Sequence, residues 1–120
     1  ILQHGVILEK ATLTFNGIGH IIKGAKGADA QQESRVLMLS DQARSDANPI
    51  LLIDENDVTA GHAASIGQVD PEDMYYLMSR GFSEVEAKHI IVESMIRPII
   101  DRIGDETIEE AALAAVRNKI

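Results

Sequence analysis

His62 is the side chain in this 120-residue sequence that is best suited to metal binding or proton transfer. An imidazole changes charge near neutral pH and is a common metal ligand. Residues 58–67 alternate as a strand does, which places His62 on the more apolar face with Ala60 and Ala64, opposite a face of small residues. Two interpretations follow: a buried histidine whose nitrogens bond to backbone groups, which the spacing alone favours, or a metal or proton-transfer site.

Asp54, Glu55 and Asp57 form a second candidate site, because clustered carboxylates can bind a hard cation or act as acid and base. They lack the spacing of an EF-hand loop, and charged turns between strands are usually solvated. The alternative function built on them is a carbohydrate-active β-helix enzyme. It requires a groove with a basic partner, and this segment offers only Arg35 and Arg44.

The remaining motifs that could carry chemistry are incomplete. His4, His20 and His89 are scattered, without the spacing of a zinc site. No serine lies in a G-x-S-x-G context, and the Gly17-x-Gly19 pair opens no predicted helix. The sequence therefore predicts a protein that is not an enzyme and has no tightly bound cofactor.

Composition excludes several functional classes. Nineteen acidic against eleven basic residues give a net charge of −8, which argues against binding a polyanion. There is no cysteine, so the chain has no disulfide and no thiol nucleophile. No apolar run approaches the ~20 residues of a membrane span. These features favour the cytoplasm, and the strand-like start at Ile1 suggests a piece of a longer protein.

The elements that position these residues change in character near Asp70. Before it, alternating β-branched runs separated by glycine, aspartate and asparagine predict short strands at residues 5–8, 11–15, 20–23, 34–39, 50–53 and 58–66. Such strands fit a sandwich, a barrel or a β-solenoid, and no internal repeat selects among them. Two domains are predicted, residues 1–69 and residues 70–120.

Three helices are predicted after the change at Asp70. Asp70 is an N-cap followed by Pro71 at the first helical position, and Gly81 can end this helix. Ser83 and Glu86 form a capping box that opens a longer helix. The first two helices are therefore expected to begin directly after Asp70 and Ser83.

The longer helix has an apolar stripe at helical spacing, made of Val85, His89, Val92, Ile96, Ile99 and Ile103. Two i,i+4 ion pairs are expected on its outer side, Glu84–Lys88 and Glu93–Arg97. Pro98 is expected to kink or split the helix before Gly104. Thr107 and Glu110 are expected to open the last helix.

Three stretches carry a resemblance to a known family: residues 32–40, residues 47–67, and Tyr76-Leu77-Met78-Ser79-Arg80-Gly81 after the strand that contains His62. They resemble the SufB/SufD family of iron–sulfur cluster assembly proteins, from about Leu13 to Pro98. The resemblance implies the end of a right-handed parallel β-helix followed by a small C-terminal helical segment. Members are several hundred residues long, so the chain resembles only their C-terminal part.

Individual residues indicate the SufD branch of that family. SufB proteins carry an Arg-Cys-Asp-x-Leu-Leu-x-Gly motif, and here Ser34 stands at the cysteine that is thought to accept sulfur. Serine cannot carry a persulfide. SufB proteins also have Glu directly after the histidine that matches His62, where this chain has Ala63. Some SufD proteins have a cysteine two residues before that histidine, and here it is Ala60.

The resemblance implies a non-enzymatic scaffold that works with a SufB-like subunit and the SufC ATPase. Edge strands near residues 50–66 would pair with the SufB-like subunit, and His62 would be a ligand of iron or of a transient cluster at that interface. The helices would dock the ATPase through Tyr75, Tyr76, Arg80 and Phe82, or would simply cap the solenoid. Without a partner, the edge strand is expected to pair with a second copy.

Overall fold

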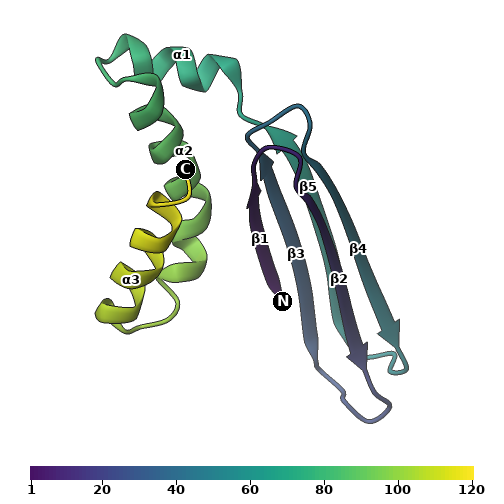
Figure 1. Ribbon diagram of the computed structural model, residues 1–120. Coiled ribbons are helices and arrows are strands. Elements are labelled where there is room, and N and C mark those ends of the chain that lie inside the picture. Colours follow the sequence, from purple (N-terminus) through teal and green to yellow (C-terminus); the bar gives the residue numbers. More distant parts are fainter. The chain divides into compact units, whose positions relative to one another are not determined.

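The computed structural model describes residues 1–120 as five strands followed by three helices (Figure 1). The strands are β1 (Leu2–Ile7), β2 (Thr12–Ile21), β3 (Asp29–Met38), β4 (Arg44–Ile53) and β5 (Thr59–Gln68). The helices are α1 (Pro71–Ser79), α2 (Glu84–Ile100) and α3 (Glu106–Arg117). The chain divides into two compact units, Ile1–Gly67 and Gln68–Ile120, each of which is described by itself.

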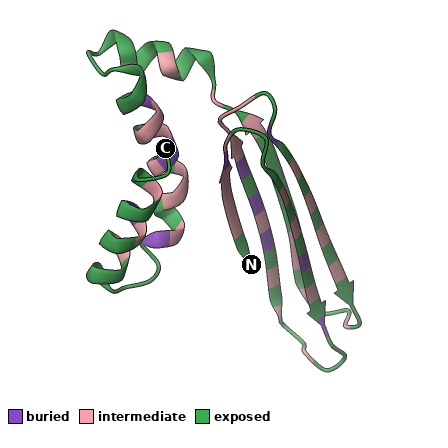
Figure 2. Cartoon of the chain, viewed as in Figure 1, coloured by how far each residue is buried: buried purple, intermediate pink, exposed green.

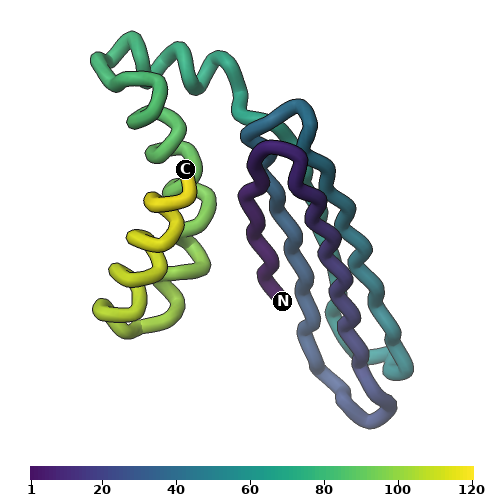
Figure 3. The backbone as a smooth tube through the Cα atoms, in the orientation of Figure 1, coloured from purple at the N-terminus to yellow at the C-terminus, as the bar shows by residue number.

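The first unit, called the strand unit below, contains two parallel sheets. One has the order β1-β3-β5 and the other the order β2-β4, so successive strands alternate between the sheets. The arrowheads of β3 and β5 point one way and those of β2 and β4 the other (Figure 1), and the backbone trace shows the chain returning to each sheet in turn (Figure 3). This architecture confirms a mixed β/α chain with parallel sheets and three helices. Neither sheet is closed on itself.

The pairing repeats at a nearly constant interval along the chain. Leu2 lies opposite Glu33 and Thr12 opposite Arg44, so the chain returns to the same sheet position after 31 and 32 residues. This structural repeat is not accompanied by a sequence repeat, because residues at equivalent positions differ in chemistry: Phe15, for example, lies opposite Ala47. The two short strands predicted at residues 11–15 and 20–23 are one strand, β2, since the glycines between them stay extended.

The interior of the strand unit is apolar at one end. Ile7, Val36 and Ala43 are buried there, with Leu13, Phe15 and Met38 packed against them. Burial alternates along β2 and β3, which Figure 2 shows as bands of colour, because successive side chains of a strand point to opposite faces.

Further along β3 the interior becomes polar. Gln32 and Ser34 are 5% and 3% exposed. The Gln32 amide nitrogen donates to the Ile50 carbonyl at 3.1 Å, which ties β3 to β4 across the interior. Gly19 gives this side chain room, because a Cβ on Gly19 would lie 2.6 Å from Gln32 Nε2. Glycine in a strand interior often marks such a close approach.

The second unit, called the helical unit, begins at the caps that the sequence predicts. Asp70 accepts a hydrogen bond from the Glu72 backbone at 2.8 Å, and Ser83 and Glu86 form the capping box of α2. Gly81 follows α1 with a φ of 101°, which other residues rarely adopt. None of the three helices has the length and apolar character needed to span a lipid bilayer.

The covered face of α2 agrees in part with the predicted stripe. Val92 is buried and His89, Ile96 and Ile99 are half-buried, as predicted. Ala87 and Ile100 are buried as well, whereas Val85 is 61% exposed and Ile103, 46% exposed, lies beyond the end of the helix. Pro98 does not split the helix as predicted: α2 continues through it to Ile100, at the loss of the one backbone hydrogen bond that the Pro98 nitrogen cannot donate.

The α3 helix begins earlier than predicted and is joined to α2 by an ion pair. Its N-cap is Asp105, whose carboxylate accepts from two backbone N–H groups, so Thr107 lies inside the helix. The Arg117 guanidinium donates two hydrogen bonds to the Glu93 carboxylate, one of them 2.9 Å long. Glu93 is therefore paired across the two helices, and Arg97 instead lies 3.8 Å from Asp101.

Glu93→Gln is expected to make the helical unit less sensitive to acid. The hydrogen bond from Arg117 holds the pKa of Glu93 below its ordinary value. A lowered folded-state pKa adds stability at neutral pH, and that stability is lost as the pH falls through the folded-state value. The free energy of unfolding of wild type should exceed that of Glu93→Gln by about 1 kcal/mol at pH 7, because the Arg117 side chain is half exposed. This difference should shrink as the pH falls below the ordinary carboxyl pKa and vanish once the pH is below the folded-state value.

Urea denaturation followed by helical circular dichroism at several pH values would measure this difference. Glu110→Gln, which changes an exposed carboxylate on α3, is the control and should show no such pH-dependent gap. If the difference in unfolding free energy between wild type and Glu93→Gln were the same at pH 3 and pH 7, the stabilisation would not come from the ionised Glu93 carboxylate.

Candidate functional site

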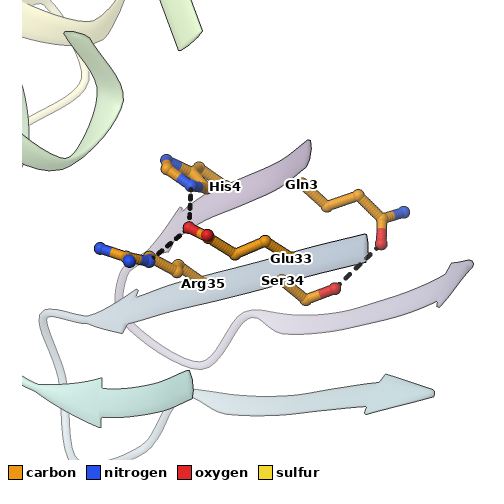
Figure 4. A network of polar contacts seen from close by, with 5 residues as sticks. All are labelled: Gln3, His4, Glu33, Ser34 and Arg35. Atoms are coloured by element: carbon orange, nitrogen blue, oxygen red, sulfur yellow. Dashed lines mark hydrogen bonds and ion pairs between the residues drawn. The ribbon is translucent and has the colours of Figure 1, made fainter. Parts of the chain in front are cut away.

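Ser34 lies at the centre of the strand unit's polar residues. It sits on β3 directly opposite Gln3 of β1. Its hydroxyl donates to the Gln3 side-chain oxygen at 3.0 Å (Figure 4). The residue is almost fully buried, and this bond satisfies its hydroxyl. Because the Ser34 hydroxyl is buried and donates its proton to a neutral amide rather than to a base, it is not arranged as a nucleophile.

An ion-pair network lies on the other face of the same strands. One oxygen of Glu33, Oε1, is 2.6 Å from Arg35 Nε and 3.4 Å from His4 Nε2 (Figure 4). The His4 side chain is only 5% exposed, while the Arg35 side chain is 56% exposed. The register brings this network together, because it places His4 opposite Arg35. Arg35 presents its remaining donors to solvent beside a carboxylate.

An open cavity of about 180 Å³ lies beside β3 and β5 at this point. It is lined by residues 33–35 of β3 and residues 63–65 of β5. The β5 side contributes only Ala63, Ala64 and Ser65, and these small side chains leave the space open. The cavity offers one acidic group, one basic group and serine hydroxyls, so it suits a small polar group better than an apolar one.

His62 is exposed on β5, two positions from Ala64. The buried histidine that the spacing favours is therefore wrong. His62 does not line the cavity. No group of three or more His, Cys, Asp or Glu side chains in the chain is placed to hold a metal ion.

Two of the three carboxylates in the connection between β4 and β5, those of Asp54 and Glu55, accept hydrogen bonds. Asp54 bonds to His20 at 2.8 Å, and Glu55 accepts from the backbone N–H groups of Gly24 and Asn56 at 2.9 Å each. These hydrogen bonds, above all the one from Gly24, hold the pKa of Glu55 below its ordinary value. Carboxylates committed to such bonds do not form an acid–base pair, and nothing in the structure favours the carbohydrate-active alternative.

The four residues predicted to dock an ATPase lie on α1 and just after it. Tyr75 is 76% exposed, Tyr76 56% and Phe82 42%. The Arg80 guanidinium lies 5.2 Å from the centre of the Tyr76 ring, a cation–π contact between the two side chains. We call Tyr75, Tyr76, Arg80 and Phe82 the aromatic surface. Exposed tyrosine and arginine are the residue types that most often anchor protein interfaces.

Sequence reasoning missed the network that joins Gln3 and His4 to residues 33–35. These pairs are thirty residues or so apart in sequence and share no local motif. The only feature of the sequence that relates these residues is their spacing of about 31 positions, and this spacing has meaning only once β1 is known to pair with β3.

Residues 1–95 match the family described as "SUF system FeS cluster assembly, SufBD core domain". The iron–sulfur cluster assembly protein SufD of Bacillus subtilis (strain 168) is 52% identical over 120 residues, which is 100% of this chain and 28% of that protein. The SufD protein of Escherichia coli (strain K12) is 27% identical over 119 residues, 99% of this chain and 28% of that protein. A SufBD family protein of a Synechocystis species is 33% identical over 102 residues, 85% of this chain and 22% of that protein. The chain thus spans about a quarter of the length of these relatives.

Proposed function

Because this chain belongs to the SufBD core family of the SUF iron–sulfur cluster assembly system, we propose that it acts as a SufD-type scaffold and not as an enzyme. The 52% identity to a SufD protein over the whole chain supports this assignment. Ser34 supports it too, since a serine at the sulfur-accepting position of SufB leaves the chain without a sulfur carrier of its own. The cytoplasm is the compartment that a cysteine-free scaffold of this kind would occupy.

We further propose that the strand unit forms successive coils of a right-handed parallel β-helix. The alternation of strands between two parallel sheets supports a solenoid, as does the return to each sheet after 31 or 32 residues. The right-handed sense follows from the strong preference of parallel crossover connections for that hand. Such a stack presents an open edge at its last strand, here β5.

The SufB-type subunit is proposed to add a strand at this open edge, near His62. The observation that carries the proposal is that His62 is exposed on β5 while the chain supplies no other residues to complete a metal site. A transient cluster beside His62 would then need its further ligands, including any thiolate, from the partner. In the absence of that partner, the same edge is expected to pair with a second copy of the chain.

The aromatic surface is proposed to dock the SufC-type ATPase. Its exposure and its Arg80–Tyr76 cation–π contact support an interface role. Movement of the ATPase would be passed through the helices toward the edge where His62 lies.

His62→Ala in the full-length protein is expected to reduce iron–sulfur occupancy of the reconstituted three-subunit complex by about tenfold or more, because losing one ligand weakens a metal site by at least as much as losing a supporting group. Anaerobic reconstitution followed by iron and sulfide analysis would measure it, after size exclusion confirms an intact complex. His20→Ala, at another exposed histidine of the strand unit, is the control and should leave occupancy unchanged.

Loss of the complex itself would make His62 a structural residue of the interface. Unchanged occupancy with an intact complex would remove His62 from the site and leave the chain as a scaffold alone.

A further inference from the structure

We propose that Met78 is a site of reversible oxidation, at which a peroxide converts the thioether to a sulfoxide and thereby weakens docking on the aromatic surface. This inference rests on the proposed function, in which that surface binds the SufC-type ATPase. It goes further by assigning a chemical modification, and the class of oxidant that makes it, to a residue beside that surface.

Met78 is the one exposed sulfur-containing residue of the chain. The sequence has no cysteine and four methionines. Met78 is 46% exposed, whereas Met38, Met74 and Met95 are half-buried. Met38 also packs against the apolar cluster of the strand unit. An oxidant in solution must reach the sulfur atom in order to react, so Met78 is the first target that this chain offers to a peroxide.

The geometry of α1 places Met78 beside the aromatic surface. Residues three apart lie on the same side of a helix, and Met78 is three residues after Tyr75, which is 76% exposed. Met74 and Leu77, also three apart, are the half-buried residues of the helix. The Gly81 N–H donates to the Met78 carbonyl at 3.0 Å, so the backbone of Met78 is held at the end of α1. Met78 therefore shares the exposed side of this helix with Tyr75.

The reaction needs only the thioether and a peroxide. With hydrogen peroxide, the Met78 sulfur attacks one peroxide oxygen, so that a sulfur–oxygen bond forms as the oxygen–oxygen bond breaks. The hydroxide that leaves takes the proton of the transferred hydroxyl group and becomes water. Sulfur gives up two electrons and the peroxide takes them up, and the products are methionine sulfoxide and one water molecule.

The product changes the chemistry of the docking surface. A flexible apolar side chain becomes a polar one whose oxygen accepts hydrogen bonds strongly. Docking would take this oxygen out of water, and an interface formed around a thioether supplies no donor for it. The sulfoxide therefore opposes docking. A docked ATPase in turn covers the thioether, so the reaction acts on the free subunit, and methionine sulfoxide reductases reverse it.

Peroxide treatment of the full-length protein, with the excess removed by catalase, tests the assignment. Wild type, Met78→Leu and the matched control Met74→Leu would each be titrated calorimetrically with untreated ATPase, before and after treatment. Treatment should weaken binding about tenfold for wild type and for Met74→Leu. It should leave the affinity of Met78→Leu within about twofold of its own untreated value. Sulfoxide reductases specific for each epimer should together restore binding by wild type.

Peptide mass spectrometry of wild type gives a second measurement that needs no variant. In the free protein Met78 should be oxidised before Met38, Met74 and Met95, and bound ATPase should slow its oxidation. If untreated wild type does not bind the ATPase, the proposed docking is wrong and this inference falls with it. Three results with binding intact would overturn the oxidation site alone: Met78 is not oxidised first, the ATPase does not protect it, or treatment weakens Met78→Leu as much as wild type.

Discussion

Gly19→Ala is expected to destabilise the strand unit by about 2–3 kcal/mol, the sum of overpacking and a displaced buried hydrogen bond. A Cβ at this position would lie 2.6 Å from Gln32 Nε2 and 3.1 Å from a methyl carbon of Leu51. The glutamine can move aside only by releasing the Ile50 carbonyl, to which it donates at 3.1 Å. Since Gln32 is 5% exposed, no solvent is at hand to replace that bond.

Hydrogen exchange of the β2 and β4 amides in the 120-residue chain would measure the loss of stability in the strand unit separately from the stability of the helical unit. Gly67→Ala is the matched control, because no atom lies within 4 Å of the added Cβ, and it should be nearly neutral. In the background of Gln32→Ala, the cost of Gly19→Ala should fall by half or more, since the obstructing side chain is gone. An undiminished cost in that background would place the strain elsewhere than at Gln32.

Tyr76→Ala is expected to weaken binding of the SufC-type ATPase by about thirtyfold or more, the effect of truncating an interface anchor. Removing the Tyr76 ring also frees Arg80, which loses the surface on which it stacks. The side chain is more than half exposed, so the stability of the helical unit should barely change. The expected result is thus a large loss of affinity without a loss of folding.

Calorimetric titration of the ATPase with the full-length protein would measure the affinity, with thermal melts of each variant alongside. Ile108→Ala is the control, since it truncates an equally exposed side chain on α3, outside the aromatic surface. Equal losses for the two variants would indicate that the aromatic surface has no special role in docking.

The helix boundaries could be predicted because their signals are local. Asp70 and Ser83 each bond to a backbone N–H two or three residues ahead, so the residues that make the cap also stand together in the sequence. The covered face of α2 could be predicted only in part. Apolar spacing correctly selects Val92, but it does not reveal that Ala87 is buried and Val85 exposed, because that depends on how the neighbouring helices pack.

The candidate site was predictable only in part, for a related reason. His62 and Ser34 could be singled out from their own stretches of sequence, but their surroundings come from strands thirty residues away. The exposure of His62 reflects the open side of β5, which the alternation of its side chains does not reveal. The Glu33 network depends on the pairing of β1 with β3, which no local pattern encodes.

The 31- and 32-residue intervals between paired strands also bear on how the chain folds. Each ladder can begin only after the chain has closed a loop of about thirty residues. Closing this loop costs conformational entropy before any backbone hydrogen bond of the ladder has formed to compensate for it. Proteins dominated by such distant contacts fold slowly, whereas helices with local contacts form early. The strand unit is therefore the slow-folding part of the molecule. Until its ladders close, the uncharged β5 segment is available for pairing with any extended chain nearby, so early encounter with its partner would protect it from aggregation.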